Sequence, residues 1–166
     1  REIVATDAEN ITALRSAKID QPGAIARAAA MDQAERIARL PDLKLELEDV
    51  PLPMAEEYFK KIAIELAQNA FKFSEHGTPV RVTLREAGEE VEFSVHDHGR
   101  GLSTEHIRRI DAYVQFERKM HDEQGLGLGL AIAKKLAELH GGRLVIQSNR
   151  ETGTTVSVKL PKAQKT

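Results

Sequence analysis

The stretch "DEQGLGLGLAIAKKLAELHGG", residues 122–142, carries the most informative pattern in the chain. Its second half has the apolar spacing of a helix, and Gly141 provides an ordinary C-terminal stop. Three glycines, Gly125, Gly127 and Gly129, precede that helix at intervals of two residues. Each of them would cost about 1 kcal/mol inside a helix. We therefore expect the backbone at this point to approach another group unusually closely.

The glycines match neither of two well-known phosphate-binding patterns. The string G-x-x-x-x-G-K-[ST] does not occur, and Leu130 and Ile132 stand where G-x-G-x-x-G requires its third glycine. What remains is glycine-rich backbone that leads into a helix N-terminus, where free N–H groups and the helix dipole favour an anion. The alternative is a flexible hinge in front of a core helix.

Composition limits the classes of protein to consider. The chain has 166 residues, of which 41% are hydrophobic and 30% charged, and this is typical of one soluble globular domain. A net charge of −2, few aromatic residues and no Trp argue against nucleic-acid binding. The absence of Cys excludes disulfides and thiolate metal sites. No apolar run approaches the roughly 18 residues of a membrane span, so we expect no membrane contact by this chain.

The hydrophobic periodicity predicts a mixed order of helices and strands. We expect helices at about 22–40, 55–73, from Ser103 onward and from the glycine run to 141, and strands at 16–20, 43–50, 80–87, 91–98, 143–149 and 154–161. The strands at 80–87 and 91–98 are predicted to form a hairpin with its turn at Gly88. The fold class is therefore α+β, with a mixed, mostly antiparallel sheet and the helices on one face.

The strand "VEFSVHDHG", residues 91–99, ends in a carboxylate. Two-residue alternation places Asp97 on the same core-facing side as the three apolar residues before it. A carboxylate buried there would need a hydrogen-bond donor. Gly99 and Gly101 follow at once and allow backbone to come close, although Asp97 could equally cap a β-turn. The histidines that flank Asp97 have no third ligand at a convincing spacing, so a metal site is not favoured.

The helix "EEYFKKIAIELAQNAFKFS", residues 56–74, has a polar stripe beside its apolar arc. The arc consists of Phe59, Ile62, Leu66, Ala70 and Phe73. Glu65, Asn69 and Lys72 follow one another at i, i+4 and i+7. They could be a solvated face with a Lys61–Glu65 ion pair. Together they could also provide an acid to orient a water or hydroxyl, an amide oxygen for Mg²⁺ and an ammonium group for phosphate.

The connection between Gly101 and Gly125 is long for a compact domain. Connections of this length tend to be lids or disordered segments. Phe116 and Arg118 provide an apolar anchor and a cation two residues apart, which suits a lid over a triphosphate. An exposed surface loop is the alternative.

Five stretches follow one another along the chain: "ELAQNAFKFS", "DHGRGL", "QFERK", "GLGLGLAIAKKLAELHGG" and "GTTVSVKLP". Together they strongly resemble the catalytic ATP-binding domain of two-component sensor histidine kinases, a member of the GHKL ATPase superfamily that includes gyrase and the mismatch-repair ATPases. The resemblance covers about residues 17–162 and implies a two-layer α/β sandwich that holds Mg–ATP between its helices and a lid. We assign residues 17–166 to this domain and residues 1–16 to the tail of an upstream helical hairpin.

The resemblance also implies roles for individual residues. Asp97 would accept a hydrogen bond from the adenine amino group, with Gly99, Gly101 and Thr154 around the base. Asn69 would ligate Mg²⁺, and Lys72 would contact phosphate. Glu65 occupies the position of the residue that polarises the attacking water in gyrase-type relatives. Residues that would close the phosphate side are Phe116, Arg118 and the run of Gly125, Leu126, Gly127, Leu128 and Gly129.

One departure from such kinases concerns the phosphate acceptor. It is usually a histidine on the helical hairpin, followed by Glu or Asp and Leu-Arg, and none of the six histidines here has that context. We therefore expect the chain, which begins at Arg1, to be a fragment whose acceptor lies outside it. The implied partners are the hairpin of the same or a partner chain and a response regulator receiver domain. The full protein would be a homodimer. This chain would be cytoplasmic, either as part of a cytoplasmic protein or as the cytoplasmic part of a membrane-anchored sensor.

The sequence thus predicts a histidine kinase catalytic domain that uses ATP and Mg²⁺. A GHKL ATP hydrolase remains open because of Glu65, and so does a nucleotide-sensing or docking module without enzymatic activity. A serine-directed kinase of the anti-sigma type shares the fold and also remains open.

Overall fold

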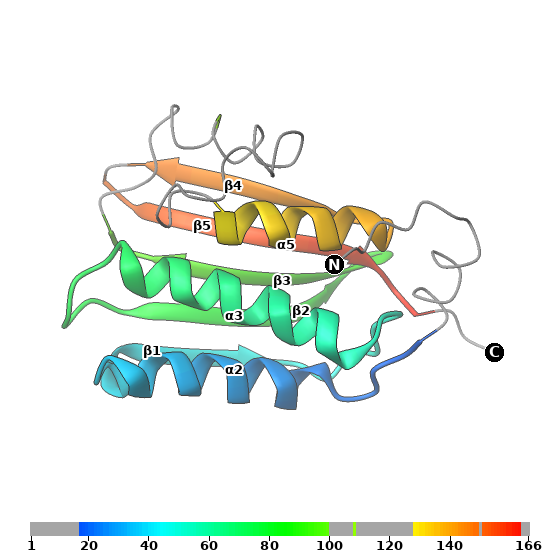
Figure 1. Cartoon of the computed structure of the whole chain (residues 1–166), viewed down its shortest axis with the longest axis horizontal. Helices are drawn as coiled ribbons and strands as arrows, with labels where there is room; N and C mark the ends of the chain where they lie inside the picture. Colours follow the sequence, from blue (N-terminus) through cyan, green and yellow to red (C-terminus); the bar gives the residue numbers. More distant parts are fainter. Residues whose placement is uncertain (1–16, 100–107, 109–127, 150, 164–166) are drawn as a thin grey trace.

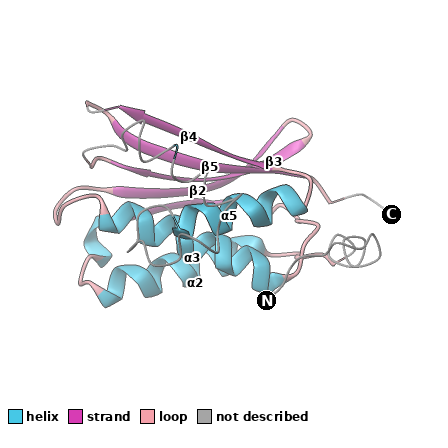
Figure 2. Ribbon diagram, turned by 45° about the horizontal axis from the view of Figure 1, so that its top comes forward, coloured by secondary structure: helices cyan, strands magenta, loops and turns pink. Residues whose placement is uncertain are grey.

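A five-stranded sheet carries three α-helices on one face in the computed structural model, which describes residues 17–99, 108, 128–149 and 151–163 (Figure 1). The helices are α2 (Pro22–Arg36), α3 (Glu56–Lys72) and α5 (Leu128–Leu139), with a short 3-10 helix, η1 (Leu40–Asp42). The strands are β1 (Leu43–Leu47), β2 (Val80–Ala87), β3 (Glu90–Asp97), β4 (Arg143–Asn149) and β5 (Gly153–Pro161). Figure 2 shows the two layers edge-on, which confirms the predicted α+β sandwich. In this described part of the chain no helix is both long and apolar enough to cross a membrane.

The strand order in the sheet is β1-β2-β3-β5-β4, and only the β1–β2 pair is parallel. Parallel neighbours need a long crossover, and α3 provides it between β1 and β2. The predicted hairpin of β2 and β3 is confirmed, with Gly88 at φ 66° in its turn. In the centre of the sheet, Asp97 at the end of β3 lies opposite Val80 of β2 and Thr154 of β5.

The core lies between α3 and the middle of the sheet. Phe59 of α3 packs edge-on against Phe93 of β3, with ring centroids 5.3 Å apart. The alternation predicted for β3 is confirmed, because Val91, Phe93, Val95 and Asp97 are all buried. The central helix therefore packs directly on the strand that ends in Asp97.

The predicted apolar arc of α3 is wrong at one position. Phe71 is buried, whereas Phe73 is only half-buried and is the C-terminal capping residue of the helix. The helical period places Phe73 on the arc only if the helix continues, and α3 ends at Lys72. Phe73 is thereby left to line a cavity instead of the core.

The helix α2 ends earlier than predicted. It stops at Arg36 instead of about residue 40, because Ala38 takes the left-handed conformation at φ 56° and the Arg39 N–H bonds back to the Ala34 carbonyl oxygen over 2.8 Å. Ala38 is the only non-glycine residue with a positive φ in the described part of the chain. This turn reverses the chain and directs Arg39 inward.

The other elements differ less from their predicted bounds. The short strand expected at 16–20 is reduced to an isolated bridge between Ile19 and Leu52, and β1 ends at Leu47 instead of residue 50. The predicted stop of the last helix is confirmed, since α5 ends at Leu139 and Gly141 has φ 82°. The helical tail expected at residues 1–16 lies outside the described residues, and of the helix expected from Ser103 only Arg108 is described, in helical conformation.

We predict that Ala38→Gly raises the free energy of unfolding by about 1 kcal/mol, because glycine adopts the left-handed conformation without the steric cost of a Cβ. Urea unfolding followed by circular dichroism measures the change. The matched control is Ala28→Gly, an exposed position inside α2, which is expected to lower stability by about 1 kcal/mol. A loss of stability in Ala38→Gly would contradict the account of this turn.

Candidate functional site

One end of the molecule gathers the expected site residues that the structure describes. The end of α3, the end of β3 and the starts of β5 and α5 meet there, at the left of Figure 1. The residues brought to this end are Asn69 and Lys72 of α3, Asp97 and Gly99 at the end of β3, Gly129 of α5 and Thr154 of β5. Glu65 lies one turn of α3 before Asn69. Residues from four separate segments therefore form one region.

Asp97 is a buried carboxylate at the end of the central strand. Only 2% of its surface is exposed, and its Oδ1 accepts a hydrogen bond from the Gly99 N–H over 2.8 Å. Burial raises the pKa of Asp97 above its ordinary value, while the Gly99 hydrogen bond and the nearby His98 and Arg39 side chains act in the opposite direction. The site thus holds a strong hydrogen-bond acceptor out of water.

Glycines allow backbone to close around this carboxylate. A Cβ on Gly99 would collide with the carbonyl oxygen of Phe73 at the end of α3. A Cβ on Gly153 would collide with the carbonyl oxygen of Asp97, and Gly153 also has φ 89°. The close approach that the sequence predicted after Asp97 is therefore made by the end of α3.

Thr154 is buried beside Asp97 in the register of β3 and β5. Its hydroxyl and that of Ser148 on β4 are 2.8 Å apart and share a hydrogen bond in which either can be the donor. A threonine was expected at this position from the resemblance, and the pairing with β3 explains how it comes to lie beside the carboxylate.

Glu65 lies on the side of α3 that faces α5. It is 9% exposed, and its Oε2 is 2.6 Å from Lys61 Nζ, so the predicted ion pair is present. A Cβ on Gly129 would collide with Oε1 of the same carboxylate. Gly129 therefore permits close packing of α5 on α3, and Glu65 is held between a lysine and the first turn of α5.

A cavity of about 400 Å³ opens at the same end. It is lined by Lys72, Phe73, Ser74, Glu75, Thr78, His98 and Gly99. The Lys72 ammonium group lies 5.7 Å from the centroid of the Phe73 ring. Most of the wall comes from the loop between α3 and β2, residues 73–79, for which the sequence predicts no functional role. Its only local signal is a run of polar residues directly after the helix.

The two histidines that flank Asp97 do not face the core. Their rings meet edge-on with centroids 4.8 Å apart, and His96 Nδ1 lies 2.7 Å from Thr155 Oγ1. Burial lowers the pKa of His96. Within the described ranges there is no group of three or more His, Cys, Asp or Glu residues that could hold a metal ion.

Several predicted site residues lie outside the described residues. They are Gly101, Phe116, Arg118, Gly125, Leu126 and Gly127. Leu128 is the first residue of α5.

Residues 54–164 match the family model described as histidine kinase-, DNA gyrase B- and HSP90-like ATPase. The chain belongs to this family. The match includes α3, the strands β2 to β5 and the whole candidate site. The predicted membership of the GHKL ATPases is thus confirmed.

Relatives of this ATPase family domain include sensor kinases. The chain is 41% identical over 103 residues to histidine protein kinase DivJ of Caulobacter vibrioides, which covers 61% of this chain and 17% of DivJ. It is 34% identical over 121 residues to the heme sensor protein HssS of Staphylococcus saprophyticus, which covers 73% of this chain and 26% of HssS. The chain thus spans about a sixth to a quarter of the length of these relatives.

Solved structures share the fold. The catalytic domain of histidine kinase ThkA aligns with a TM-score of 0.71 at 24% identity, over 88% of this chain and 95% of that domain. Full-length ShkA, solved in complex with AMPPNP, aligns with a TM-score of 0.69 at 26% identity, over 92% of this chain and 32% of ShkA. The described sheet and helices therefore have the arrangement found in histidine kinase catalytic domains.

We predict that the burial of Asp97 makes stability depend on pH. The pKa of Asp97 is raised in the folded state. Its contribution to the free energy of unfolding is therefore fully present below the pKa of the unfolded chain, near 3.8, and is lost as pH rises through the folded pKa. Asp97→Asn removes this loss, so the stability of the variant relative to wild type should increase between about pH 4 and pH 7. Urea unfolding at several pH values measures the difference.

The control for this experiment is Asp32→Asn, which makes the same change at an exposed residue paired with Arg36 on α2. A relative stability of Asp97→Asn that stays constant or decreases over this pH range would contradict the assigned burial.

Proposed function

We propose that this chain is the catalytic ATP-binding domain of a sensor histidine kinase, which transfers the γ-phosphoryl group of ATP to a histidine outside the chain. The observation that carries the proposal is the buried Asp97 carboxylate beside an open cavity, in a chain that is 41% identical to a histidine protein kinase over 103 residues. The complex of the related ShkA with AMPPNP, an analogue of ATP, supports the choice of nucleotide.

Asp97 is proposed to recognise adenine. A carboxylate shielded from water accepts a hydrogen bond from an exocyclic amino group more strongly than an exposed one does, because the local dielectric constant is low. Guanine carries a carbonyl oxygen at the corresponding position and would face the carboxylate with a second acceptor. The buried hydroxyl of Thr154 lies next to Asp97 across the strand pair and would complete the polar wall around the base.

The phosphates are proposed to lie along the end of α3. Lys72 lines the cavity and would contribute a positive charge, and Asn69 lies one helical turn before Phe73 with a half-buried side chain. An amide oxygen fits Mg²⁺, which takes few protein ligands and completes its shell with phosphate oxygens and water. The phosphate contacts proposed for Phe116, Arg118 and the glycine run rest on the resemblance in sequence.

In the proposed reaction the bond from the γ-phosphorus to the bridging oxygen of ADP breaks, and a bond to an imidazole nitrogen of the acceptor histidine forms. Such transfers depend on positioning and charge stabilisation. Bound Mg²⁺ would neutralise charge on the phosphate oxygens. Lys72 would hold the phosphate chain, and Asp97 would fix the base. Glu65, paired with Lys61 and packed on Gly129, would support the packing of α3 against α5.

The partners proposed are those of a two-component system. The acceptor histidine would lie on a helical hairpin of the same or a partner chain, and a response regulator receiver domain would then take the phosphoryl group. The full protein would be a homodimer with this domain in the cytoplasm. These proposals follow the sensor kinases to which the chain is related, of which it spans only a part.

We predict that Asp97→Asn weakens the binding of Mg–ATP by about 1–3 kcal/mol, or roughly five- to 150-fold, because a charged acceptor is lost from a buried site. Titration calorimetry measures the dissociation constant. Asp32→Asn serves as the control and should bind as wild type does. Unchanged affinity in Asp97→Asn would remove this residue from the nucleotide site.

We predict that Asn69→Ala abolishes Mg-dependent transfer to an acceptor hairpin supplied in trans, while some nucleotide binding remains. Transfer is measured with ATP labelled at the γ-phosphate. The matched control is Gln68→Ala on the same helix, whose side chain bonds Gln33 of α2 over 3.3 Å. Full transfer by Asn69→Ala would contradict its magnesium role. In the wild type, hydrolysis of ATP without transfer would indicate a hydrolase, and binding without either reaction would indicate a nucleotide-sensing module.

A further inference from the structure

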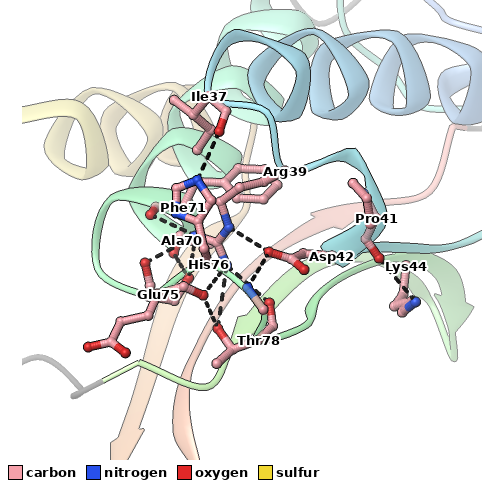
Figure 3. Close-up of polar contacts among 12 residues, drawn as sticks. Ile37, Arg39, Pro41, Asp42, Lys44, Ala70, Phe71, Glu75, His76 and Thr78 are labelled. Carbon is pink, nitrogen blue, oxygen red and sulfur yellow. Dashed lines mark hydrogen bonds and ion pairs between the residues drawn. The ribbon is translucent and has the colours of Figure 1, made fainter.

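Arg39 is a buried arginine whose guanidinium group faces the loop between α3 and β2 (Figure 3). Only 1% of the residue is exposed. Its Nε donates to Asp42 Oδ2 over 2.7 Å, and its two terminal nitrogens donate to oxygens of the loop and of the last turn of α3. These acceptors are the carbonyl oxygens of Phe71, Ser74, Glu75 and Thr78, at 3.1, 3.0, 2.7 and 3.0 Å.

Carbonyl oxygens from one short loop converge on this group. The Ser74 hydroxyl lies 3.1 Å from the same guanidinium, and the guanidinium carbon lies 5.1 Å from the centroid of the Phe71 ring. Arginine presents its donors in a rigid planar fork, so it can hold several acceptors in one fixed arrangement. The loop 73–79 has no regular secondary structure of its own to set that arrangement.

The segment around Arg39 makes further contacts with the loop. Asp42 Oδ2 accepts the Gly77 N–H over 3.0 Å as well as the Arg39 Nε–H, and the His76 ring Nε2 lies 3.1 Å from the Ile37 carbonyl oxygen. The hydrogen bond from Arg39, followed by that from Gly77, lowers the pKa of Asp42, so this carboxylate stays charged. The turn after α2 thus binds the loop 73–79 along much of its length.

The same loop forms most of the cavity wall and contacts the strand end that carries Asp97. Phe73, Ser74, Glu75 and Thr78 line the cavity. The carbonyl oxygen of Phe73 lies against Gly99, which in turn donates to Asp97. The loop is therefore held between Arg39 on one side and the Asp97 strand end on the other.

The residue before Arg39 has a backbone conformation that is unfavourable for a side chain. Ala38 is left-handed at φ 56°, a conformation that costs a non-glycine residue free energy and persists where its surroundings require it. The Arg39 N–H that follows bonds back to the Ala34 carbonyl oxygen, and the Arg39 side chain lies buried beyond this turn.

We propose that Arg39 is a positioning residue of the nucleotide site, which sets the place of the loop 73–79 relative to Asp97 and so determines nucleotide affinity. The proposal rests on the proposed function, since it takes the cavity to be the ATP site. Arg39 itself does not line the cavity and acts through the loop.

The test compares the dissociation constants for Mg–ATP of wild type and Arg39→Lys, at a temperature where circular dichroism shows every variant to be fully folded. Lysine keeps the charge but loses the planar fork. We expect the dissociation constant to rise on the order of tenfold, because displacement of a site by about an ångström weakens the interactions it makes. Amide hydrogen exchange should accelerate in residues 73–79 and at Gly99, while exchange in the distant half of β3 stays as in the wild type.

Two controls separate positioning from stability. Arg36→Lys makes the same substitution in the last turn of α2, where Arg36 is exposed and pairs only with Asp32 among the contacts described. Val91→Ala creates a cavity in the core at the far end of β3 and lowers stability without touching the loop. Both are expected to bind Mg–ATP as wild type does.

If Arg39→Lys does not fold, Asp42→Asn decides the question. This variant weakens the contacts to Arg39 and Gly77 and should also raise the dissociation constant, by a smaller factor. Wild-type affinity in a folded Arg39→Lys, or an equal loss of affinity in Val91→Ala, would overturn the positioning role and leave the proposed function intact. A wild-type protein that binds no nucleotide would overturn both.

Discussion

The packing of α3 across the centre of the sheet is the interaction on which the rest of the structure depends. Phe59 meets Phe93 edge-on in the core, and the helix is flanked by α2 on one side and α5 on the other (Figure 2). This packing fixes the end of α3 against the end of β3, where the Phe73 carbonyl oxygen lies on Gly99. The candidate site is formed at this meeting point, so its geometry is a consequence of core packing and not of a separate binding element.

Much of this arrangement could be predicted from the sequence, because local periodicity and burial coincide in the central elements. The alternation of β3 gave the buried face that includes Asp97, and the bounds of α3 and the hairpin of β2 and β3 were predicted within a residue or two. Two features could not be predicted from local patterns. Arg39 is buried only because carbonyl groups more than thirty residues later surround it, and arginines are usually exposed. Phe73 lies outside the core because α3 ends at Lys72, and periodicity alone does not predict where a helix ends.

The site gathers buried charges that a core devoted to stability would avoid. Asp97 is buried with its pKa raised, which means that its ionised form lowers stability at neutral pH. Glu65 is buried with one lysine partner, whereas Arg39 has hydrogen-bond acceptors on all sides. A buried charge that is well paired fixes a unique local structure, and one that is incompletely paired is available to a ligand. By this criterion Arg39 organises the site.

The most direct test of the account is an NMR titration of the amide groups of the ¹⁵N-labelled chain with Mg–ATP. If nucleotide binds where the structure gathers these residues, the largest shifts will fall at Asp97, Gly99, Phe73 and Thr154, with little change around the turn at Gly88 at the other end of the sheet. Saturating Mg–ATP that shifts none of these amides, or that shifts mainly the turn at Gly88, would contradict the claim that this end of the molecule is a nucleotide site.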